Sequence, residues 1–312
     1  MNILITGGAG FIGSHLAKKY ANQDNHIYII DNLLTGNKKN IDSISKDKIT
    51  FIQEDIINFD FKNIPQIDIL YHLASPASPI QYKKHPVETM RVNSEGTHKV
   101  LEFCRSGKAG RMVLASTSEI YGDPLEHPQK ETYWGNVNSV GDRACYDEGK
   151  RFAEAMTMTY HRKFDIDVRI ARIFNTYGPN MEENDGRVVS NFITQAIHNL
   201  PITIYGKGEQ TRCFCYVSDM VSGLALLGET ENIEGEIINL GNPDEKTILE
   251  LAEIIQDMTD TKSEIIYEAI GQDDPKKRKP DISKAKSFLS WEPKVSLSDG
   301  LTKTIEYFSN IF

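Results

Sequence analysis

The sequence predicts an α/β fold in which a doubly wound, mostly parallel sheet is joined to a second, smaller lobe. Two observations carry this prediction. Short apolar runs of strand length alternate with helix-length segments in the first half of the chain, and a glycine-rich turn follows the first run. Alternation at this spacing is typical of right-handed crossovers between parallel strands. After about Gly178 the elements become shorter and prolines more frequent, which indicates the second lobe.

The expected elements follow in order from the apolar runs and the residues that bound them. We expect strands over residues 2–6, 26–31, 49–55, 67–74 and 111–115, and helices over 14–22 and 86–107. Ser116 is expected to begin the polar turn after the fifth strand. We divide the chain into a dinucleotide-binding domain of the Rossmann type, residues 1–178, and a lobe formed mainly by residues 179–312. Within 213–242, segments 216–227 and 236–240 are expected to return to the first domain.

Charge and composition argue against several classes of function. The net charge of -9 disfavours non-specific binding to nucleic acid or an anionic membrane, because both need a basic face. No apolar stretch approaches the roughly 20 residues of a membrane span, and the first residues lack the features of a signal peptide. The four cysteines, Cys104, Cys145, Cys213 and Cys215, lack metal-site spacing and are expected to be reduced. We therefore expect a cytoplasmic protein without a metal.

The glycine-rich turn is the first candidate site. Gly7, Gly10 and Gly13 form G-x-x-G-x-x-G between the first strand and the first helix, a variant of the dinucleotide fingerprint. Glycine permits the sharp turn and the close approach of a pyrophosphate, while the helix amino-terminus offers free N–H groups. The motif alone is weak, because a glycine turn can also belong to a sheet that binds nothing.

An acidic residue strengthens the cofactor interpretation. Asp31 lies 18 residues past Gly13, at the end of the second strand, where a carboxylate can accept hydrogen bonds from an adenosine ribose. A 2'-phosphate would be repelled there, so the sequence predicts NAD, with Lys38 and Lys39 keeping NADP as the alternative. Asp55, at the end of the third strand, is expected to reach the adenine. The other residues expected around the cofactor are Phe11, Ile12, Asn32, Thr35, Gly36, Ile56 and Leu73.

Tyr146 and Lys150 form a second motif, Y-x-x-x-K, in a segment of strong helix formers. Residues four apart share a helix face. A nearby ammonium stabilises phenolate, so we expect the pKa of Tyr146 to fall from its reference of about 10. Tyr146 would then act as a general base for a hydroxyl, and Lys150 could also hold the nicotinamide ribose. The alternative is that the spacing has no functional meaning and the two residues are only a pair on the surface of an exposed helix.

Residues 116–119 read STSE at the end of the fifth strand. Parallel strands present functional groups at their carboxyl ends, so Thr117, Ser118 and Glu119 are expected at the crevice of a doubly wound sheet. The alternative is that Thr117 and Glu119 only cap the turn that follows.

Together these segments resemble the extended short-chain dehydrogenase/reductase family that acts on nucleotide sugars, nearly from end to end. Within it they are most similar to the UDP-glucuronate decarboxylases, also called UDP-xylose synthases. The segments that carry this closer resemblance are 72–79, 115–124, 143–151, 171–179, 184–192 and 273–282. Ser118 stands where 4,6-dehydratases typically have aspartate, the acid needed for loss of water. Epimerases of the family usually lack the glutamate found here at Glu119.

The resemblance implies a closed redox cycle on UDP-glucuronate. NAD would accept hydride from C4 while Tyr146 removes the 4-hydroxyl proton, carbon dioxide would leave the resulting β-keto acid, and hydride would return to C4 to give UDP-xylose. Thr117 or Ser118 would bind the C4 oxygen and Glu119 would act near C5. The implied catalytic residues are Tyr146, Lys150, Glu119, Thr117, Ser118 and Arg278.

Substrate recognition is expected in the second lobe. Asn175 matches the family asparagine at the sugar diphosphate, and Arg187, Arg212 and Arg278 are candidates for the phosphates and the glucuronate carboxylate. By composition alone, Arg278 in KKRK would pass for part of a solvated charge run. Thr203 and Tyr205 could line the uracil, although alternating ITIY is also a plain strand.

The resemblance also implies a homodimer, because helices equivalent to segments 86–104 and 144–163 form a four-helix bundle in this family. Rival hypotheses remain open. One is a decarboxylase that releases a UDP-4-keto-pentose and NADH, and another is a 4,6-dehydratase or 4-epimerase. A non-enzymatic NAD(H) sensor is the third, which the retention of Tyr146, Lys150 and Glu119 disfavours.

Overall fold

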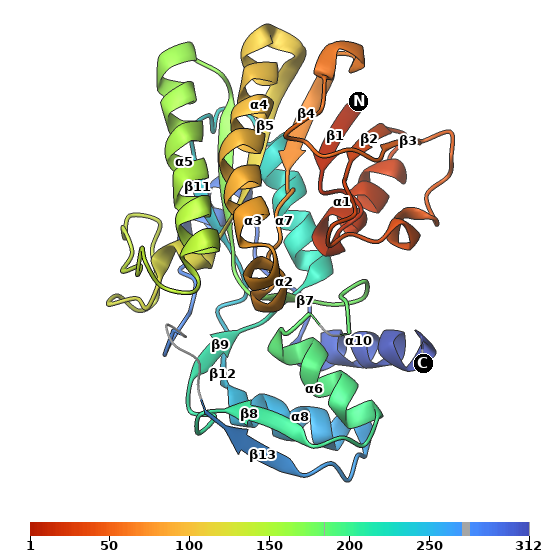
Figure 1. Ribbon diagram of the computed structural model, residues 1–312, viewed down its shortest axis with the longest axis vertical. Coiled ribbons are helices and arrows are strands. Elements are labelled where there is room, and N and C mark those ends of the chain that lie inside the picture. The colour runs from red at the N-terminus through yellow and green to blue at the C-terminus, as the bar shows by residue number, and fades with distance from the viewer. Residues whose placement is uncertain (184, 270–274, 312) are drawn as a thin grey trace.

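A computed structural model describes residues 1–183, 185–269 and 275–311, and its centre is a parallel sheet of seven strands (Figure 1). The strand order is β11-β6-β5-β4-β1-β2-β3, and each neighbouring pair is parallel. The order reverses beside β1, and ligands of doubly wound sheets bind at such a reversal. The strands are β1 (Asn2–Thr6), β2 (His26–Ile30), β3 (Ile49–Ile52), β4 (Ile67–His72), β5 (Ala109–Thr117), β6 (Val168–Ile173) and β11 (Ile237–Leu240).

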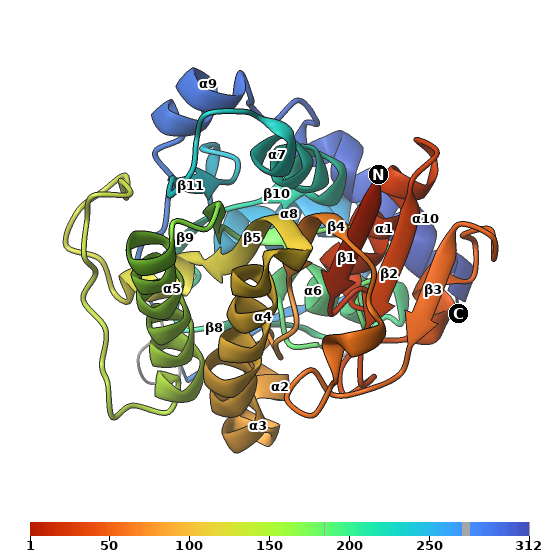
Figure 2. The same cartoon turned by 90° about the horizontal axis from the view of Figure 1, so that it is seen from above.

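Helices cover both faces of this sheet, which explains why its central strands are almost continuously apolar. In Figure 2, α1 (Phe11–Ala21), α7 (Val217–Glu229) and α9 (Ser283–Leu289) lie on one side, and α3 (Pro86–Arg91), α4 (Thr97–Phe103) and α5 (Ala144–Phe164) lie on the other. The side chains of Ile3, Leu4 and Ile5 in β1 are completely buried between these layers. The sheet is therefore a rigid support for groups displayed at its carboxyl ends.

The second lobe lies beyond those carboxyl ends (Figure 1). Strand β8 pairs parallel with β13, β9 pairs antiparallel with β12, and α6 packs on α8. Short elements α2 (Pro79–Lys84) and β7 (Thr176–Tyr177) lie between the lobe and the sheet, and β10 (Cys215–Tyr216) pairs with β7. The lobe elements are α6 (Val188–Ile197), β8 (Ile202–Tyr205), β9 (Thr211–Cys213), β12 (Glu245–Thr247), α8 (Ile248–Thr259), β13 (Ile265–Glu268) and α10 (Leu297–Ile311).

Several predicted boundaries were wrong. Ser116 and Thr117 belong to β5, because they pair with Arg172 and Ile173 of β6 instead of starting a turn. The predicted helix over 86–107 is divided into α3 and α4 by a π-helical turn, and a second such turn ends it. Helix α1 begins at Phe11, before the predicted residue 14.

Segment 237–240 joins the main sheet as β11, beside β6, while α9 from the carboxyl-terminal part of the chain packs on β11 and α7. The division of the chain at residue 178 stays a prediction. The four cysteines are free, and three of them are buried. The described helices do not combine the length and apolar character needed to cross a membrane. The described side chains also include no cluster of His, Cys, Asp and Glu that could hold a metal ion.

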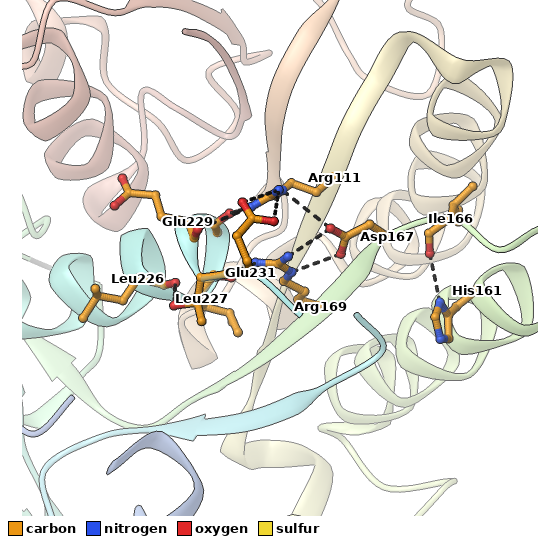
Figure 3. Close-up of polar contacts among 11 residues, drawn as sticks. Arg111, His161, Ile166, Asp167, Arg169, Leu226, Leu227, Glu229 and Glu231 are labelled. Atoms are coloured by element: carbon orange, nitrogen blue, oxygen red, sulfur yellow. Dashed lines mark hydrogen bonds and ion pairs between the residues drawn. The ribbon is translucent and has the colours of Figure 1, made fainter. Parts of the chain in front are cut away.

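A cluster of charged side chains, centred on the buried Arg169, lies at the amino-terminal ends of β5 and β6 (Figure 3). Arg169 is completely buried and makes two hydrogen bonds to Asp167, of 3.0 and 2.9 Å. It also donates to the carbonyls of Leu227 (2.7 Å) and Thr230 (2.6 Å), at the end of α7. The neighbouring Arg111 donates to the carbonyl of Gly228 at 3.0 Å. The two guanidiniums thus satisfy carbonyls that the end of α7 leaves unpaired.

Replacing Arg169 by methionine should lower the free energy of unfolding by about 3 kcal/mol, because Asp167 and two carbonyls would lose a buried partner. The cost falls at the lower end of the usual range because Asp167 keeps Arg111, 3.5 Å away. Urea titration measures the change. Arg105→Gln is the control, because Arg105 pairs with Glu102 on the surface and should cost about 0.5 kcal/mol or less. Equal losses in the two variants would contradict the assignment.

Candidate active site

A cleft of about 630 Å³ runs along the carboxyl ends of the strands, between the sheet and the segment that leads to α6. It brings together residues that are far apart in the sequence. Tyr307 and Ile311 of α10 and Gln81 of α2 complete its wall. Its lining includes all of the residues predicted to surround the cofactor, Gly7, Gly10, Phe11, Ile12, Gly13, Asp31, Asn32, Thr35, Gly36, Asp55, Ile56 and Leu73, together with Thr117, Ser118, Glu119, Tyr146, Lys150, Asn175 and Arg187.

The glycine turn forms one end of the cleft. Gly7 has a φ of +72°, and a Cβ there would lie 2.8 Å from the Cα of Ala74. A Cβ on Gly13 would lie 2.3 Å from the carbonyl oxygen of Gly7. Helix α1 starts after Gly10 without a side-chain cap, and the amides of residues 11–13 have no acceptor within the described chain. The turn is therefore shaped to bind an anion such as a pyrophosphate.

The carboxylate of Asp31 is fixed at the end of β2. Its two oxygens accept hydrogen bonds of 2.9 Å from the amides of Ala9 and Leu33. Burial raises the pKa of Asp31, and these two hydrogen bonds oppose the rise. A Cβ on Gly36 would lie 2.9 Å from the same carboxylate, so only glycine leaves it accessible. The remaining lone pairs of Asp31 can accept from the hydroxyls of a ribose.

Tyr146 and Lys150 lie in the first turns of α5 and both are buried. The ammonium of Lys150 donates to the carbonyl of Ala115 at 2.9 Å and lies 6.0 Å from the centre of the Tyr146 ring. Burial lowers the pKa of Lys150 to about 8. The phenol of Tyr146 shares a hydrogen bond with the side chain of Thr117. The pair therefore faces the carboxyl end of β5, not the protein surface.

The prediction that Lys150 lowers the pKa of Tyr146 was wrong for this arrangement. Burial raises the pKa of Tyr146 above its ordinary value, and the hydrogen bond with Thr117 only partly offsets the rise. The reason is that the ammonium is directed at the backbone of β5, while the phenol is almost completely removed from water.

Tyr82 is a neighbour of Tyr146 that the sequence did not reveal. It comes from α2, is 1% exposed, and stacks on the Tyr146 ring with centroids 5.0 Å apart and planes at 3°. Its hydroxyl has no hydrogen-bond partner among the described residues. The stack fixes the plane of the Tyr146 ring.

Glu119 is held between two arginines. Arg278 donates to one carboxylate oxygen and Arg143 to the other, and Arg278 also donates to the carbonyl of Gly122 at 3.0 Å. Burial alone would raise the pKa of Glu119, but the charges of Arg278 and Arg143 lower it to about 2. Arg278 is only 2% exposed, so the interpretation of this residue as part of a solvated charge run was wrong.

Arg143 and Asp147 are further site residues that sequence reasoning missed. The carboxylate of Asp147 lies 3.9 Å from the Nε of Arg143, and burial and the charge of Glu119 raise its pKa to about 7. The signal available in the sequence was an i,i+4 pair of opposite charge at the start of the helix that carries Tyr146.

The residues predicted to bind the substrate fall into three places. Asn175 lines the cleft, and Arg187 lies there with its guanidinium 5.4 Å from the Phe11 ring, at the glycine turn. Arg212 is buried outside the lining, and its charge acts on Glu119. Thr203 and Tyr205 lie on β8, also outside the lining, where Thr203 bonds to Gln195 and Tyr205 is half exposed. Of segments 184–192 and 273–282, positions 184, 273 and 274 lie outside the described residues.

A buried polar network supports the strand end that carries Thr117 to Glu119. Ser116 donates to Glu154 at 2.5 Å, and Glu154 accepts two hydrogen bonds from Arg172, of 3.0 and 2.8 Å. Arg172 donates to the hydroxyl of Tyr121 at 3.0 Å, and Tyr121 donates to Asn239 at 2.8 Å. The network joins β5 to α5, β6 and β11, so hydrogen bonds to three other elements hold the end of β5 in place.

Similarity to known proteins extends over nearly the whole chain. Residues 4–304 match the family model described as GDP-mannose 4,6 dehydratase. The chain is 51% identical to UDP-glucuronic acid decarboxylase 1 of Arabidopsis thaliana, over 99% of this chain and 70% of the relative. It is 50% identical to UDP-glucuronic acid decarboxylase 1 of Danio rerio, over 98% and 72%. The crystal structure of UDP-glucuronic acid 4-epimerase from Bacillus cereus, in complex with UDP-glucuronic acid and NAD, is similar with a TM-score of 0.92 and 32% identity, over 100% of both chains.

Proposed function

The chain belongs to the GDP-mannose 4,6-dehydratase family of extended short-chain dehydrogenases/reductases, and from this premise we propose that it is an NAD-dependent carboxy-lyase that converts UDP-glucuronate to UDP-xylose. One observation carries the proposal: Arg278 pairs with Glu119, and the charge of Glu119 acts in turn on the Tyr146 phenol, so the three side chains belong to one buried cluster. A decarboxylase needs a cation for the sugar carboxylate and a base for the 4-hydroxyl. It needs no acid for a departing water, and Ser118 supplies none.

The cofactor-binding residues are those of the glycine turn, Asp31, Asp55 and Lys150. NAD, when bound, supplies the oxidant for C4 and returns the hydride at the end of the cycle. The unpaired amides of residues 11–13 would bind its pyrophosphate, and Asp31 would accept from its adenosine ribose. The position of Arg187 over Phe11 favours this pyrophosphate over the substrate's phosphates as its partner.

Replacing Asp31 by asparagine should erode the discrimination between NAD and NADP by about tenfold or more, because the buried negative charge that repels a 2'-phosphate is lost. Binding of each cofactor is measured by titration of the purified protein. Asp42→Asn is the control, because Asp42 is exposed and does not line the cleft. An unchanged preference in Asp31→Asn would refute the ribose contact.

The chain's own groups account for the chemistry at the sugar. Tyr146 is the base, and in its ionised form it takes the proton of the 4-hydroxyl, while Thr117, already bonded to Tyr146, supports the C4 oxygen. The 4-keto acid then loses its carboxylate as carbon dioxide, because the C4 carbonyl accepts the electron pair as an enolate. Arg278 pairs the carboxylate before it leaves. One proton from solvent is then added at C5 near Glu119, and Tyr146 returns its proton to the C4 oxygen when C4 is reduced again.

The function is tested by incubating the protein with NAD and UDP-glucuronate while carbon dioxide and the absorbance of NADH are followed together. Release of carbon dioxide without lasting NADH, with UDP-xylose as product, is the expected result. Carbon dioxide matched by NADH would identify the second candidate, a decarboxylase that releases the UDP-4-keto-pentose. No carbon dioxide would refute decarboxylation and direct the search to 4-epimerisation or 4,6-dehydration.

The protein is further proposed to act as a cytoplasmic homodimer through a four-helix bundle of segments 86–104 and 144–163. Val87, Met90 and Phe152 support this interface, because they are 63%, 51% and 50% exposed on α3 and α5. Met156 and Met158, by contrast, pack partly against the core of their own chain. Light scattering on the wild type and on Met90→Glu should give a dimer and a monomer, and a monomeric wild type would contradict the bundle.

A further inference from the structure

The carboxylate of Glu119 lies among arginines. Three guanidiniums act on it, those of Arg278, Arg143 and Arg212, and all three side chains are largely buried. The carboxylate of Asp147 also acts within this group, 3.9 Å from Arg143. Under the proposed function a further anion, the carboxylate of the substrate, binds to Arg278.

Arg278 is the arginine that can change partners. One end of its guanidinium is fixed to the carbonyl of Gly122, and the other binds Glu119. The side chain is only 2% exposed, and its buried Nε has no acceptor among the described residues. A substrate carboxylate that binds this guanidinium competes with Glu119 for it.

Arg143 is placed differently. It occupies the N-cap position of α5, three residues before Tyr146, and binds the oxygen of Glu119 that Arg278 does not bind. Its Nε lies 3.9 Å from the carboxylate of Asp147, one turn further along the same helix. Asp147 is 6% exposed, and its other oxygen has no partner among the described residues. The geometry therefore attaches Arg143 to the helix and leaves Glu119 a second cation.

We propose that Arg143 is a positioning residue, which holds Glu119 in place while the substrate's carboxylate takes Arg278, and that Asp147 keeps Arg143 in position for this task. The inference rests on the proposed function, because the competing anion is the carboxylate of UDP-glucuronate. It goes beyond that function by assigning a role to two residues that are not themselves part of the cleft lining.

A pH dependence follows from the groups around Glu119. These are Tyr82 from α2, Arg143, Tyr146 and Asp147 from α5, Arg212 from β9, and Arg278. With both arginines in place the pKa of Glu119 is about 2, so it is ionised throughout the working range. Without Arg143, one cation fewer opposes the effect of burial on the Glu119 carboxylate, so the pKa of Glu119 rises. Activity that needs the ionised carboxylate is then lost as the pH falls through this higher value.

The test compares Arg143→Gln, Arg143→Lys and Asp147→Asn with wild type, using the holoenzyme, UDP-glucuronate and carbon dioxide release. In Arg143→Gln we expect kcat to fall about 100-fold, KM to change by less than about threefold, and the acid limb of kcat to move to higher pH. Arg143→Lys should recover most of the loss and the wild-type limb, because it keeps the cation. Asp147→Asn should show a smaller fall in kcat with KM unchanged. Arg105→Gln, a surface arginine, is the matched control and should behave as wild type.

Three outcomes would overturn the inference. A wild-type kcat and pH profile in Arg143→Gln would show that Glu119 needs no second cation. A rise in KM for UDP-glucuronate as large as that of Arg278→Ala would show that Arg143 binds the substrate itself. If Arg143→Gln does not fold, as judged by its melting temperature and circular dichroism, the test depends on Arg143→Lys. A fall in kcat of about 100-fold in this variant, with the acid limb of its pH profile unmoved, would assign Arg143 a merely structural role. Absence of carbon dioxide from wild type would instead refute the proposed function, so the two failures are distinguishable.

Discussion

Replacing Tyr146 by phenylalanine should lower kcat by about 10³- to 10⁴-fold, because the variant lacks the group that takes the proton of the 4-hydroxyl. The phenol is buried, shares a hydrogen bond with Thr117, and is held in its plane by Tyr82, so the variant keeps the stacked ring and loses only the proton acceptor. Carbon dioxide release under saturating UDP-glucuronate measures the loss. The affinity for NAD, measured by titration, should change little, since only one hydroxyl is removed from a long cleft.

Tyr82→Phe is the matched control for this experiment. It removes a hydroxyl from the ring stacked on Tyr146, and that hydroxyl has no partner among the described residues. We expect less than about a tenfold effect on kcat. A wild-type kcat in Tyr146→Phe would end the assignment of Tyr146 as the base. Equal losses in both variants would point to the packing of the two rings instead of the proton transfer.

Replacing Arg278 by alanine should lower kcat/KM for UDP-glucuronate on the order of 10³-fold. The variant loses the cation for the substrate carboxylate and also leaves Glu119 with one guanidinium fewer in a buried position. Unlike Arg143, it should show a large increase in KM. The affinity for NAD should stay near the wild-type value, because Arg278 binds Glu119 and the carbonyl of Gly122 and makes no hydrogen bond to the glycine turn or Asp31 among the described residues.

Lys277→Ala is the control, because this neighbouring lysine is exposed. It should leave both kcat and KM unchanged. UDP-glucose, which has no carboxylate, provides a second comparison: its affinity should be nearly equal in wild type and Arg278→Ala. Should the variant lose UDP-glucose and UDP-glucuronate binding alike, Arg278 would belong to the nucleotide part of the site.

The parts of the site that could be predicted are those encoded by short spacing. The glycine turn, Asp31 at the next strand end, and Tyr146 four residues before Lys150 each lie within one or two elements, and the cleft lining contains all of them. The parallel sheet and its strands β1 to β5 followed from the alternation of apolar runs in the same way, whereas β6 was not among the expected strands. Local periodicity and turn chemistry are enough for such features.

Contacts between distant segments could not be predicted. Glu119 and Arg278 are 159 residues apart, and nothing in KKRK distinguishes the buried arginine from its exposed neighbours. The pKa of Tyr146 was given the wrong direction because spacing specifies the nearest charge but not the depth of burial. Ser116 was placed in a turn because its partner Arg172 belongs to a strand 56 positions later. In each case the missing information is tertiary packing.

The network behind the catalytic strand has an evolutionary consequence. The network is a chain of hydrogen bonds that runs from Ser116 through Glu154, Arg172 and Tyr121 to Asn239. Loss of any one member therefore leaves its neighbours as buried polar groups without a partner. Replacing the whole set by apolar side chains of similar volume would cost less than replacing one member. Single substitutions at these five positions should therefore be rare among relatives, and the five residue types should change together.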